Sequence, residues 1–175
     1  MVRSMPYEVL KHLGDAELRR YADIQLATVY DMEEDESFQL LFRYIEGGNE
    51  EETKLPMTTP VVTRSGVPED PSSEGQMSFV LPWDLKGRPP KPVDPRVSLE
   101  QIEGGFFAVL RFRGKAGPGE VERMTMELLG ELKEADYITD GRPFLMRYNS
   151  PFTPGFMRHN EVAVRVRQGP ERRAP

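Results

Sequence analysis

The sequence predicts an α+β fold built from two similar halves, and three observations support this prediction. Residues 18–30 align without a gap on residues 99–111, an offset of 99 − 18 = 81 positions that pairs Leu18 with Leu99 and Ala27 with Ala108. An amphipathic segment follows each copy, and two segments that alternate apolar and polar residues follow each amphipathic one. These periods are typical of a helix and of strands, so each half is predicted to run strand, helix, strand, strand.

The predicted helices are defined by apolar side chains at the i, i+3, i+4 spacing of one helical face. In the first half these side chains are Phe38, Leu41, Phe42 and Ile45, and in the second half they are Val121, Met124, Leu128 and Leu132. The first helix is expected to end at residues 47–49, Gly-Gly-Asn, because glycine and asparagine accept the left-handed conformation that closes many helices.

The predicted strands are 7–13, an extra leading strand, then 18–30, 55–64 and 76–81 in the first half and 99–111, 142–150 and 161–167 in the second. Pro60 and Pro151 lie at equivalent points and should bend or end their strands, since proline cannot donate to a sheet. The prolines in residues 82–95 favour an extended connector. We expect one domain over 1–175, with repeat halves at about 16–96 and 97–168 and a flexible tail at 169–175.

Composition and charge exclude several classes of function. With a net charge of −6 at pH 7, the chain lacks the basic excess of a nucleic-acid binder. It has no cysteine and two histidines, His12 and His159, which excludes disulfides, thiolate metal sites and a three-histidine zinc site. No apolar run approaches the ~20 residues that span a bilayer, and the first residues lack the apolar stretch of a signal peptide. We therefore expect a cytoplasmic protein with no membrane span and no nucleic-acid partner.

The sequence contains no recognisable catalytic pattern. The serines lie outside any elbow-type glycine context, and the segment GKAGPG at 114–119 lacks the spacing of a phosphate-binding loop. We therefore expect a protein that is not an enzyme. Arginine is concentrated in residues 142–173, and two interpretations are open, a solvated face or a region that attracts small anions.

Six segments, in order along most of the chain, resemble the SOUL haem-binding protein family. They are YEVLKHLGD at 7–15, LFRYIEGGNE at 41–50, KLPMTTPVV at 54–62, RPPKP at 88–92, RYNSP at 147–151 and RHNEV at 158–162. The resemblance implies two similar α+β halves that form a distorted barrel of antiparallel sheets with two outer helices, an architecture shared with gyrase-inhibitor-like ligand-sensing domains. It also implies reversible, non-enzymatic binding of haem and related tetrapyrroles, as a carrier or buffer.

The resemblance assigns the haem pocket to the first helix, residues 37–47, and to the loop before the last strand, residues 149–160. A tetrapyrrole needs a flat apolar slot, cations for its propionates and, optionally, an axial iron ligand. The apolar candidates are Phe38, Phe42, Met57, Phe152, Phe156 and Met157, the cations are Arg43, Arg147 and Arg158, and the candidate axial ligand is His159.

Three departures from the family pattern bear on this site. The histidine that some members are proposed to use as an axial ligand falls at Arg20, and two basic positions fall at Asp35 and Pro154. Arginine stays protonated and cannot ligate iron, so we expect apolar contact to dominate haem binding. For His159, an axial ligand and an ordinary surface histidine at the start of a strand are both open.

A second candidate site is a central groove between the two halves, to which we assign Tyr148 and Glu161. Strand alternation puts Glu161 on the face opposite Val162 and Val164. In the related sensing domains an acid in the groove pairs with cationic ligands, so the alternative function is the sensing of hydrophobic or cationic small molecules. The structural interpretation of Glu161 is a salt bridge to a strand arginine.

Partners follow from these interpretations. We expect a monomer whose partner is a small-molecule tetrapyrrole. A third interpretation is an interaction module in which the acidic start of the first helix docks a partner.

Overall fold

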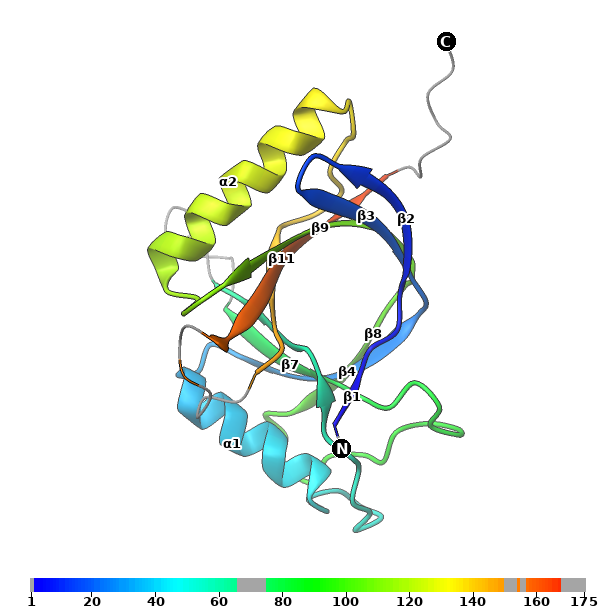
Figure 1. Ribbon diagram of the computed structural model, residues 1–175. Helices are drawn as coiled ribbons and strands as arrows, with labels where there is room; N and C mark the ends of the chain where they lie inside the picture. The colour runs from blue at the N-terminus through cyan, green and yellow to red at the C-terminus, as the bar shows by residue number, and fades with distance from the viewer. Residues whose placement is uncertain (1, 66–74, 150–153, 155–156, 168–175) are drawn as a thin grey trace. The chain divides into compact units, whose positions relative to one another are not determined.

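The computed structural model describes residues 2–65, 75–149, 154 and 157–167, which belong to two units (Figure 1). Unit 1 comprises Met1–Met5 and Asp23–Glu103, and unit 2 comprises Pro6–Ala22 and Gly104–Pro175. Each unit combines antiparallel strands with one α-helix, which confirms the predicted α+β class.

Unit 1 contains helix α1 (Glu34–Ile45) and an antiparallel sheet in the order β6-β7-β4-β8. The strands of this sheet are β4 (Ile24–Tyr30), β6 (Val61–Arg64), β7 (Gln76–Val80) and β8 (Ser98–Ile102). Two further short strands, β1 (Arg3–Ser4) and β5 (Thr58–Thr59), pair in parallel. The segment predicted as one strand over 55–64 is thus interrupted at Pro60, as its proline predicts.

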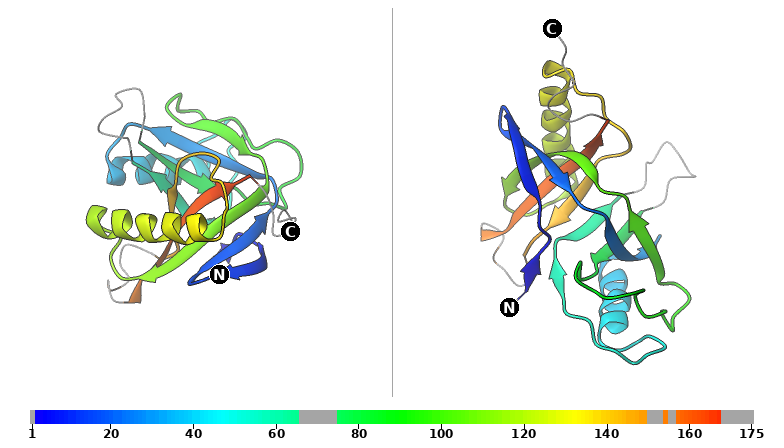
Figure 2. Two further views of the ribbon diagram at one scale, coloured as in Figure 1. Left: turned by 90° about the horizontal axis from the view of Figure 1, so that it is seen from above. Right: turned by 90° about the vertical axis from the view of Figure 1, so that its right-hand side faces the viewer.

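Unit 2 contains helix α2 (Pro118–Glu134) and an antiparallel sheet in the order β2-β3-β9-β11-β10. Its strands are β2 (Glu8–Leu13), β3 (Ala16–Tyr21), β9 (Gly105–Arg113), β10 (Phe144–Arg147) and β11 (His159–Val166). Figure 2 shows α2, in yellow, lying along one face of this sheet. Pro151, predicted to mark the end of a strand, lies outside the described residues.

The strands do not pair only within their own half of the sequence. The segment 18–30 is two strands, β3 and β4, which separate at Ala22 and Asp23. β3 pairs with β9 of unit 2, whereas β4 pairs with β7 and β8 of unit 1. Each unit therefore takes one strand from the other sequence half, and the unit boundaries differ from 16–96 and 97–168. Alternation identifies a strand, but it does not specify which strand lies beside it.

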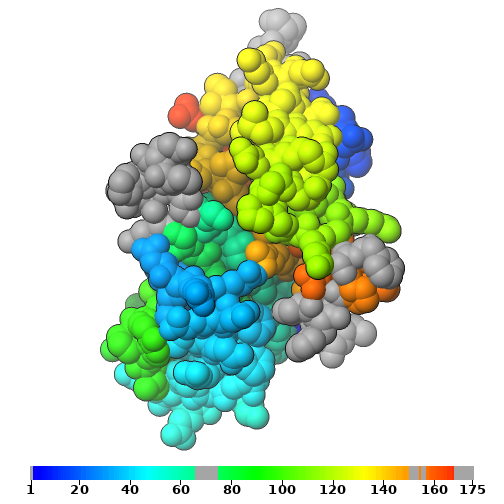
Figure 3. All heavy atoms as spheres, turned by 90° about the vertical axis from the view of Figure 1, so that its left-hand side faces the viewer, coloured from blue at the N-terminus to red at the C-terminus, as the bar shows by residue number. Residues whose placement is uncertain are grey.

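Helix α1 forms where predicted, but its buried face is not centred on the predicted residues. Its buried side chains are Ser37, Leu40, Leu41, Tyr44 and Ile45. Phe38 is only partly buried, and Phe42 is 41% exposed. The helix ends as predicted, with Gly47 in the left-handed region at φ +113°. The outer sides of both helices lie at the surface (Figure 3).

Residues 82–95 form the expected connector, without helix or strand, and it is tied to the end of α1. The Tyr44 hydroxyl donates to the carbonyl oxygen of Pro90 at 2.6 Å. The backbone N–H of Val93 donates to the carbonyl of Gly48 at 3.2 Å. These bonds explain why Tyr44, rather than Phe42, faces inward.

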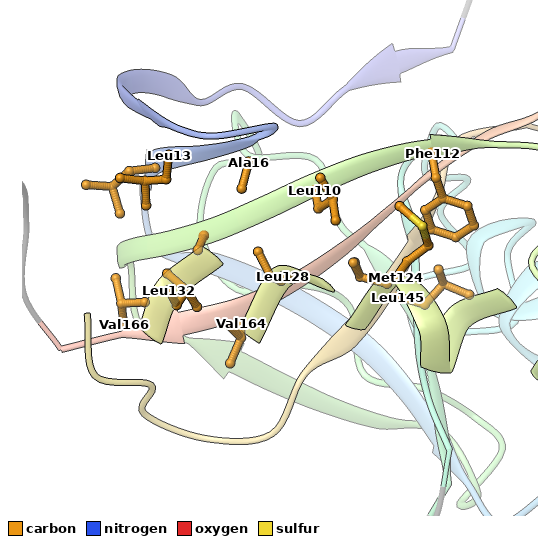
Figure 4. Close-up of a cluster of buried hydrophobic side chains, with 13 residues drawn as sticks. Leu13, Ala16, Leu110, Phe112, Met124, Leu128, Leu132, Leu145, Val164 and Val166 are labelled. Carbon is orange, nitrogen blue, oxygen red and sulfur yellow. The ribbon is translucent and has the colours of Figure 1, made fainter. Parts of the chain in front are cut away.

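The core of unit 2 lies between its sheet and α2 (Figure 4). Met124, Leu128 and Leu132 of α2 are at most 7% exposed and pack against sheet residues such as Leu110 and Val164. This stripe is the one that the sequence predicts. Among the described residues, neither helix has the length and apolar character to cross a bilayer.

The opposite face of the unit 2 sheet is polar. Because the even-numbered residues of β3, β9 and β11 pack toward α2, their odd-numbered neighbours point the other way. We call this the polar face, and its residues are Glu17, Arg19 and Tyr21 of β3, Phe107, Val109, Arg111 and Arg113 of β9, and His159, Glu161, Ala163 and Arg165 of β11.

Candidate functional site

An aromatic pair on α1 is the most prominent of the predicted haem-site residues. The rings of Phe38 and Phe42 lie one helical turn apart, with centroids 6.1 Å apart and an interplanar angle of 12°. Phe38 also contacts the ring of Phe79 edge-on, at 5.2 Å and 65°. Phe79 is part of the unit 1 core, so it fixes Phe38, which in turn supports the exposed ring of Phe42. The result is an aromatic pair on α1, of which Phe42 reaches the surface.

A cation lies next to this pair in the sequence. Arg43 is exposed in the last turn of α1, and its charge is one of several that lower the pKa of Asp94 to about 2, the largest being the hydrogen bond from Arg96. Met57 is not part of the aromatic pair on α1, because it is partly buried against the unit 1 core. The structure therefore brings Phe38, Phe42 and Arg43 together on one helix and places Met57 at the core.

The other part of the predicted pocket precedes β11 in unit 2. Phe152 and Phe156 lie outside the described residues. Met157 is 61% exposed, and the Arg158 carbonyl accepts a hydrogen bond from the backbone N–H of Gly114 at 2.9 Å. Because α1 belongs to unit 1 and this segment to unit 2, a pocket formed by both stays a prediction.

His159 is held at the start of β11 by two contacts. Its ring stacks on the ring of Tyr148, with centroids 4.7 Å apart and an interplanar angle of 16°. Its backbone N–H donates to the side-chain oxygen of Asn149 at 2.6 Å. Burial and then the charge of Arg111 lower the pKa of His159, so its imidazole is neutral near pH 7.

A metal site made of several ligands is not found in the described part of the chain. No group of three or more histidine, aspartate or glutamate residues is arranged there to hold a metal ion. Arg20, at the family's histidine position, is exposed and paired with Glu8 at 3.3 Å.

The centre of the polar face is a buried ion pair. Arg19 donates through Nη1 and Nη2 to the two carboxylate oxygens of Glu161, at 2.9 and 2.6 Å. Arg19 is 1% exposed and Glu161 is 0% exposed. The structural interpretation of Glu161 predicts such a strand arginine. Although burial opposes ionisation, the hydrogen bonds from Arg19 outweigh it and hold the pKa of Glu161 below its ordinary value.

Every N–H-bearing nitrogen of Arg19 has a partner. Its Nε donates to Glu17 at 3.0 Å, and Nη1 also donates to the hydroxyl of Tyr21 at 2.8 Å. The guanidinium carbon lies 3.8 Å from the ring centroid of Tyr7. Burial raises the pKa of Tyr21 to about 12, so its hydroxyl stays protonated. The pair is thus fixed by an acid, two tyrosines and hydrogen bonds in defined directions.

Two more residues complete the group around Glu161. Arg111 donates from Nε to the Glu161 carboxylate at 3.4 Å, and its side chain is 55% exposed. Burial and then the charge of Glu161 raise the pKa of Tyr148. The Tyr148 hydroxyl oxygen is buried and lies outside the ordinary geometry of a hydrogen bond, but it interacts with Glu161, and this contact is one of the causes that lower the pKa of Glu161.

Sequence reasoning identified Glu161 and Tyr148 but missed Arg19 and Arg111. A signal for Arg19 exists in the segment AELRRY, where alternation puts Leu18 toward the core and Arg19 on the opposite face. Because a buried carboxylate needs a cation, the arginines on that face were the candidates to consider.

The antiparallel strands and the one helix of each unit define an α+β protein. The chain belongs to the SOUL heme-binding protein family, whose family model matches residues 2–165. It is similar to Heme-binding protein 2 of Homo sapiens, with 28% identity over 158 residues that cover 85% of this chain and 77% of that protein. It is also similar to Heme-binding protein 1 of Xenopus tropicalis, with 27% identity over 136 residues that cover 76% of this chain and 70% of that protein.

Solved structures share the fold at much lower identity. The C-terminal domain of EcmrR has a TM-score of 0.63 at 11% identity, over 94% of this chain and 100% of that domain. A hydrolase encoded by lin2189 from Listeria innocua has a TM-score of 0.63 at 13% identity, over 87% of this chain and 92% of that one. At these identities the likeness shows the fold alone.

Proposed function

We propose that this protein binds haem and related tetrapyrroles reversibly and acts as a cytoplasmic carrier or buffer, without catalysing a reaction. The observation that carries the proposal is the stacked pair of Phe38 and Phe42 on α1, with Arg43 next to it in the sequence, in a chain of the heme-binding family. A porphyrin is a flat aromatic ring, and exposed flat rings offer it a stacking surface. The heme-binding proteins to which the chain is similar support the same class of ligand.

Apolar contact is the main source of affinity in this proposal. Arg43, Arg147 and Arg158 are the candidates to bind propionates, since guanidinium matches a carboxylate bidentately. His159 is the candidate axial ligand, and its neutral imidazole supports that role. Single-residue ligation at the edge of a β-strand is easily replaced by water, so the iron contact adds little to affinity.

The alternative function is the sensing of a hydrophobic cation near Glu161. A cation would gain from a buried carboxylate without a partner, but Arg19 already pairs with Glu161 through both oxygens. This pair weighs against the alternative, because a cationic ligand would have to displace a buried guanidinium.

A titration with hemin tests the proposal. Wild-type protein should shift the Soret band saturably at one equivalent. Phe42→Asp should weaken hemin binding at least about tenfold, because it removes about 1.5–3 kcal/mol of apolar contact and adds a negative charge near the propionates. Since Phe42 is 41% exposed, the melting temperature of the Phe42→Asp variant should equal that of wild type.

The matched control is Met126→Asp, which makes the same change at an exposed apolar residue of α2, 66% exposed. Met126→Asp should leave hemin affinity as in wild type. Equal affinities for the two variants, or no saturable binding of hemin to wild type, would reject the proposal.

A further inference from the structure

We infer that the polar face of unit 2 carries a second ligand site, for a small planar aromatic carboxylate, in which Arg111 binds the carboxylate and the rings of Tyr148, His159 and Tyr7 contact the aromatic part. This site shares His159, the candidate axial ligand, with the proposed haem site, but it does not use the aromatic pair on α1. The inference does not rest on haem binding.

The balance of charge on the polar face favours an anion. Among the described residues of its three strands, the cations are Arg19, Arg111, Arg113 and Arg165, and the acids are Glu17 and Glu161. Both acids already accept hydrogen bonds from Arg19. An incoming cation would therefore meet an excess of positive charge, and an anion would be attracted. Burial is the main cause of the lowered pKa of His159, and the charges of Arg111 and Arg113 add to it.

Arg111 has the donors that a carboxylate needs. Its hydrogen bond to Glu161 uses Nε, at 3.4 Å, and its side chain is 55% exposed. An arginine carries five N–H donors in a planar fork that fits the two oxygens of a carboxylate. Arg19 differs, because it is buried and its nitrogens are bonded to Glu17, Tyr21 and Glu161. Arg111 is thus the cation that can bind a ligand while Arg19 holds Glu161 in place.

Tyr148 contributes its ring beside Arg111. Its hydroxyl oxygen is buried and interacts with Glu161, and after burial this contact helps to raise the pKa of Tyr148 and to lower that of Glu161. The partly exposed ring is therefore the part of Tyr148 that a ligand meets, while the ligand carboxylate binds the guanidinium of Arg111.

Aromatic rings lie on the same face as Arg111. The ring of His159 stacks on Tyr148 at 4.7 Å, and Tyr7, which is 37% exposed, lies against the guanidinium of Arg19 at 3.8 Å. Rings on this face do not belong to the core between the sheet and α2. Their presence beside a cation is the combination that recognises an aromatic acid.

Calorimetric titration with two probes tests the inference. The probes are 2-naphthoate and (2-naphthylmethyl)ammonium, which share a ring system and have opposite charges. Naphthoate should bind at one equivalent and at least about tenfold more tightly than the ammonium probe. Arg111→Gln should weaken naphthoate binding at least about tenfold, because it removes the charged fork that binds the carboxylate.

Arg123→Gln is the control, because Arg123 is an exposed arginine on α2 that pairs with Glu120. It should leave naphthoate affinity unchanged. The affinity of Arg111→Lys, which keeps the charge but not the planar fork of the guanidinium, should lie between those of wild type and Arg111→Gln. Tighter binding of the ammonium probe, insensitivity to Arg111→Gln, or no saturable binding of naphthoate would each overturn the inference. Hemin titration of Arg111→Gln should match wild type, so failure of this site and failure of the haem proposal are distinguishable.

Discussion

Glu161 lies between its strand neighbours Met146 of β10 and Arg111 of β9 in a fully buried position, which a lone carboxylate could not occupy in its charged form. Two hydrogen bonds from Arg19 compensate for the lost water. Replacing both charges by apolar groups of similar volume is often neutral for stability, whereas removing one leaves a buried charge unpaired. The pair therefore sets which substitutions this face tolerates.

Glu161→Gln should lower the free energy of unfolding by about 3–5 kcal/mol, because it removes the fully buried counter-charge of Arg19 and leaves the guanidinium with the partly exposed Glu17. Urea unfolding measures this loss. The double variant Arg19→Met, Glu161→Leu is the control and should be clearly more stable than Glu161→Gln. A loss below about 1 kcal/mol for Glu161→Gln would contradict the assigned role of the pair.

The stability of wild type should also depend on acid pH through this residue. Because the pKa of Glu161 in the folded protein lies below its ordinary value of 4.5, the unfolded state binds a proton first as pH falls. The contribution is therefore complete above about pH 4.5 and is lost as pH falls through the folded-state pKa. Urea unfolding from pH 7 to pH 3 should show a steeper loss for wild type than for Glu161→Gln. Parallel profiles would contradict the assignment.

At the scale of the element, the two helices differ in how tightly their glycines are packed. In α2 the apolar stripe is the buried stripe, and its exposed side carries Gly130, where an added Cβ would meet nothing within 4 Å. In α1 the end of the helix is tightly packed, since a Cβ on Gly48 would lie 2.7 Å from the carbonyl oxygen of Arg43.

Gly130→Ala should raise the free energy of unfolding by about 0.5–1 kcal/mol, because alanine loses less conformational freedom in a helix than glycine does. Gly48→Ala should lower it, because its Cβ would collide with backbone that cannot move aside cheaply. Thermal and urea unfolding of both variants check the two signs. A destabilised Gly130→Ala would show that the exposed side of α2 is constrained by something other than its own backbone.

At the scale of the whole molecule, the unit to which a strand belongs determines which other strands it should unfold with. β3 belongs to unit 2, and β4, which follows it after two residues, belongs to unit 1. Stability in such proteins is lost in cooperative units rather than along the sequence. The two adjacent strands should therefore lose their hydrogen bonds in different opening events.

Hydrogen exchange of two core variants tests this expectation. Leu128→Ala in α2 should cost about 2–5 kcal/mol and should speed amide exchange in β3 at least about 30-fold, with β4 much less affected. Leu41→Ala in α1 is the matched variant and should speed exchange in β4 and β8 instead. Both leucines are 0% exposed, so the two truncations are comparable. Joint loss of protection in β3 and β4 would contradict the division.

The class of fold, the helices and the connector can be predicted from the sequence, because periodicity, proline and glycine are local signals. The buried face of α2 is predicted correctly, since Met124, Leu128 and Leu132 all pack into the unit 2 core. The sequence identified Phe42 as an apolar helix residue but not as an exposed one. That outcome depends on Tyr44, whose hydroxyl finds Pro90 on a connector 46 residues away.

The strand partners and the ion pair could not be predicted from the sequence and are known from the folded structure. Alternation assigns Arg19 and Glu161 to faces of their strands, but their meeting across 142 residues depends on β3 pairing with β9 and β9 pairing with β11. The separation of β3 from β4 has the same origin, because a strand presents equal hydrogen-bonding edges to any neighbour and only the packed sheet selects one. The charge of the polar face, and with it the inferred anion site, follows from that selection.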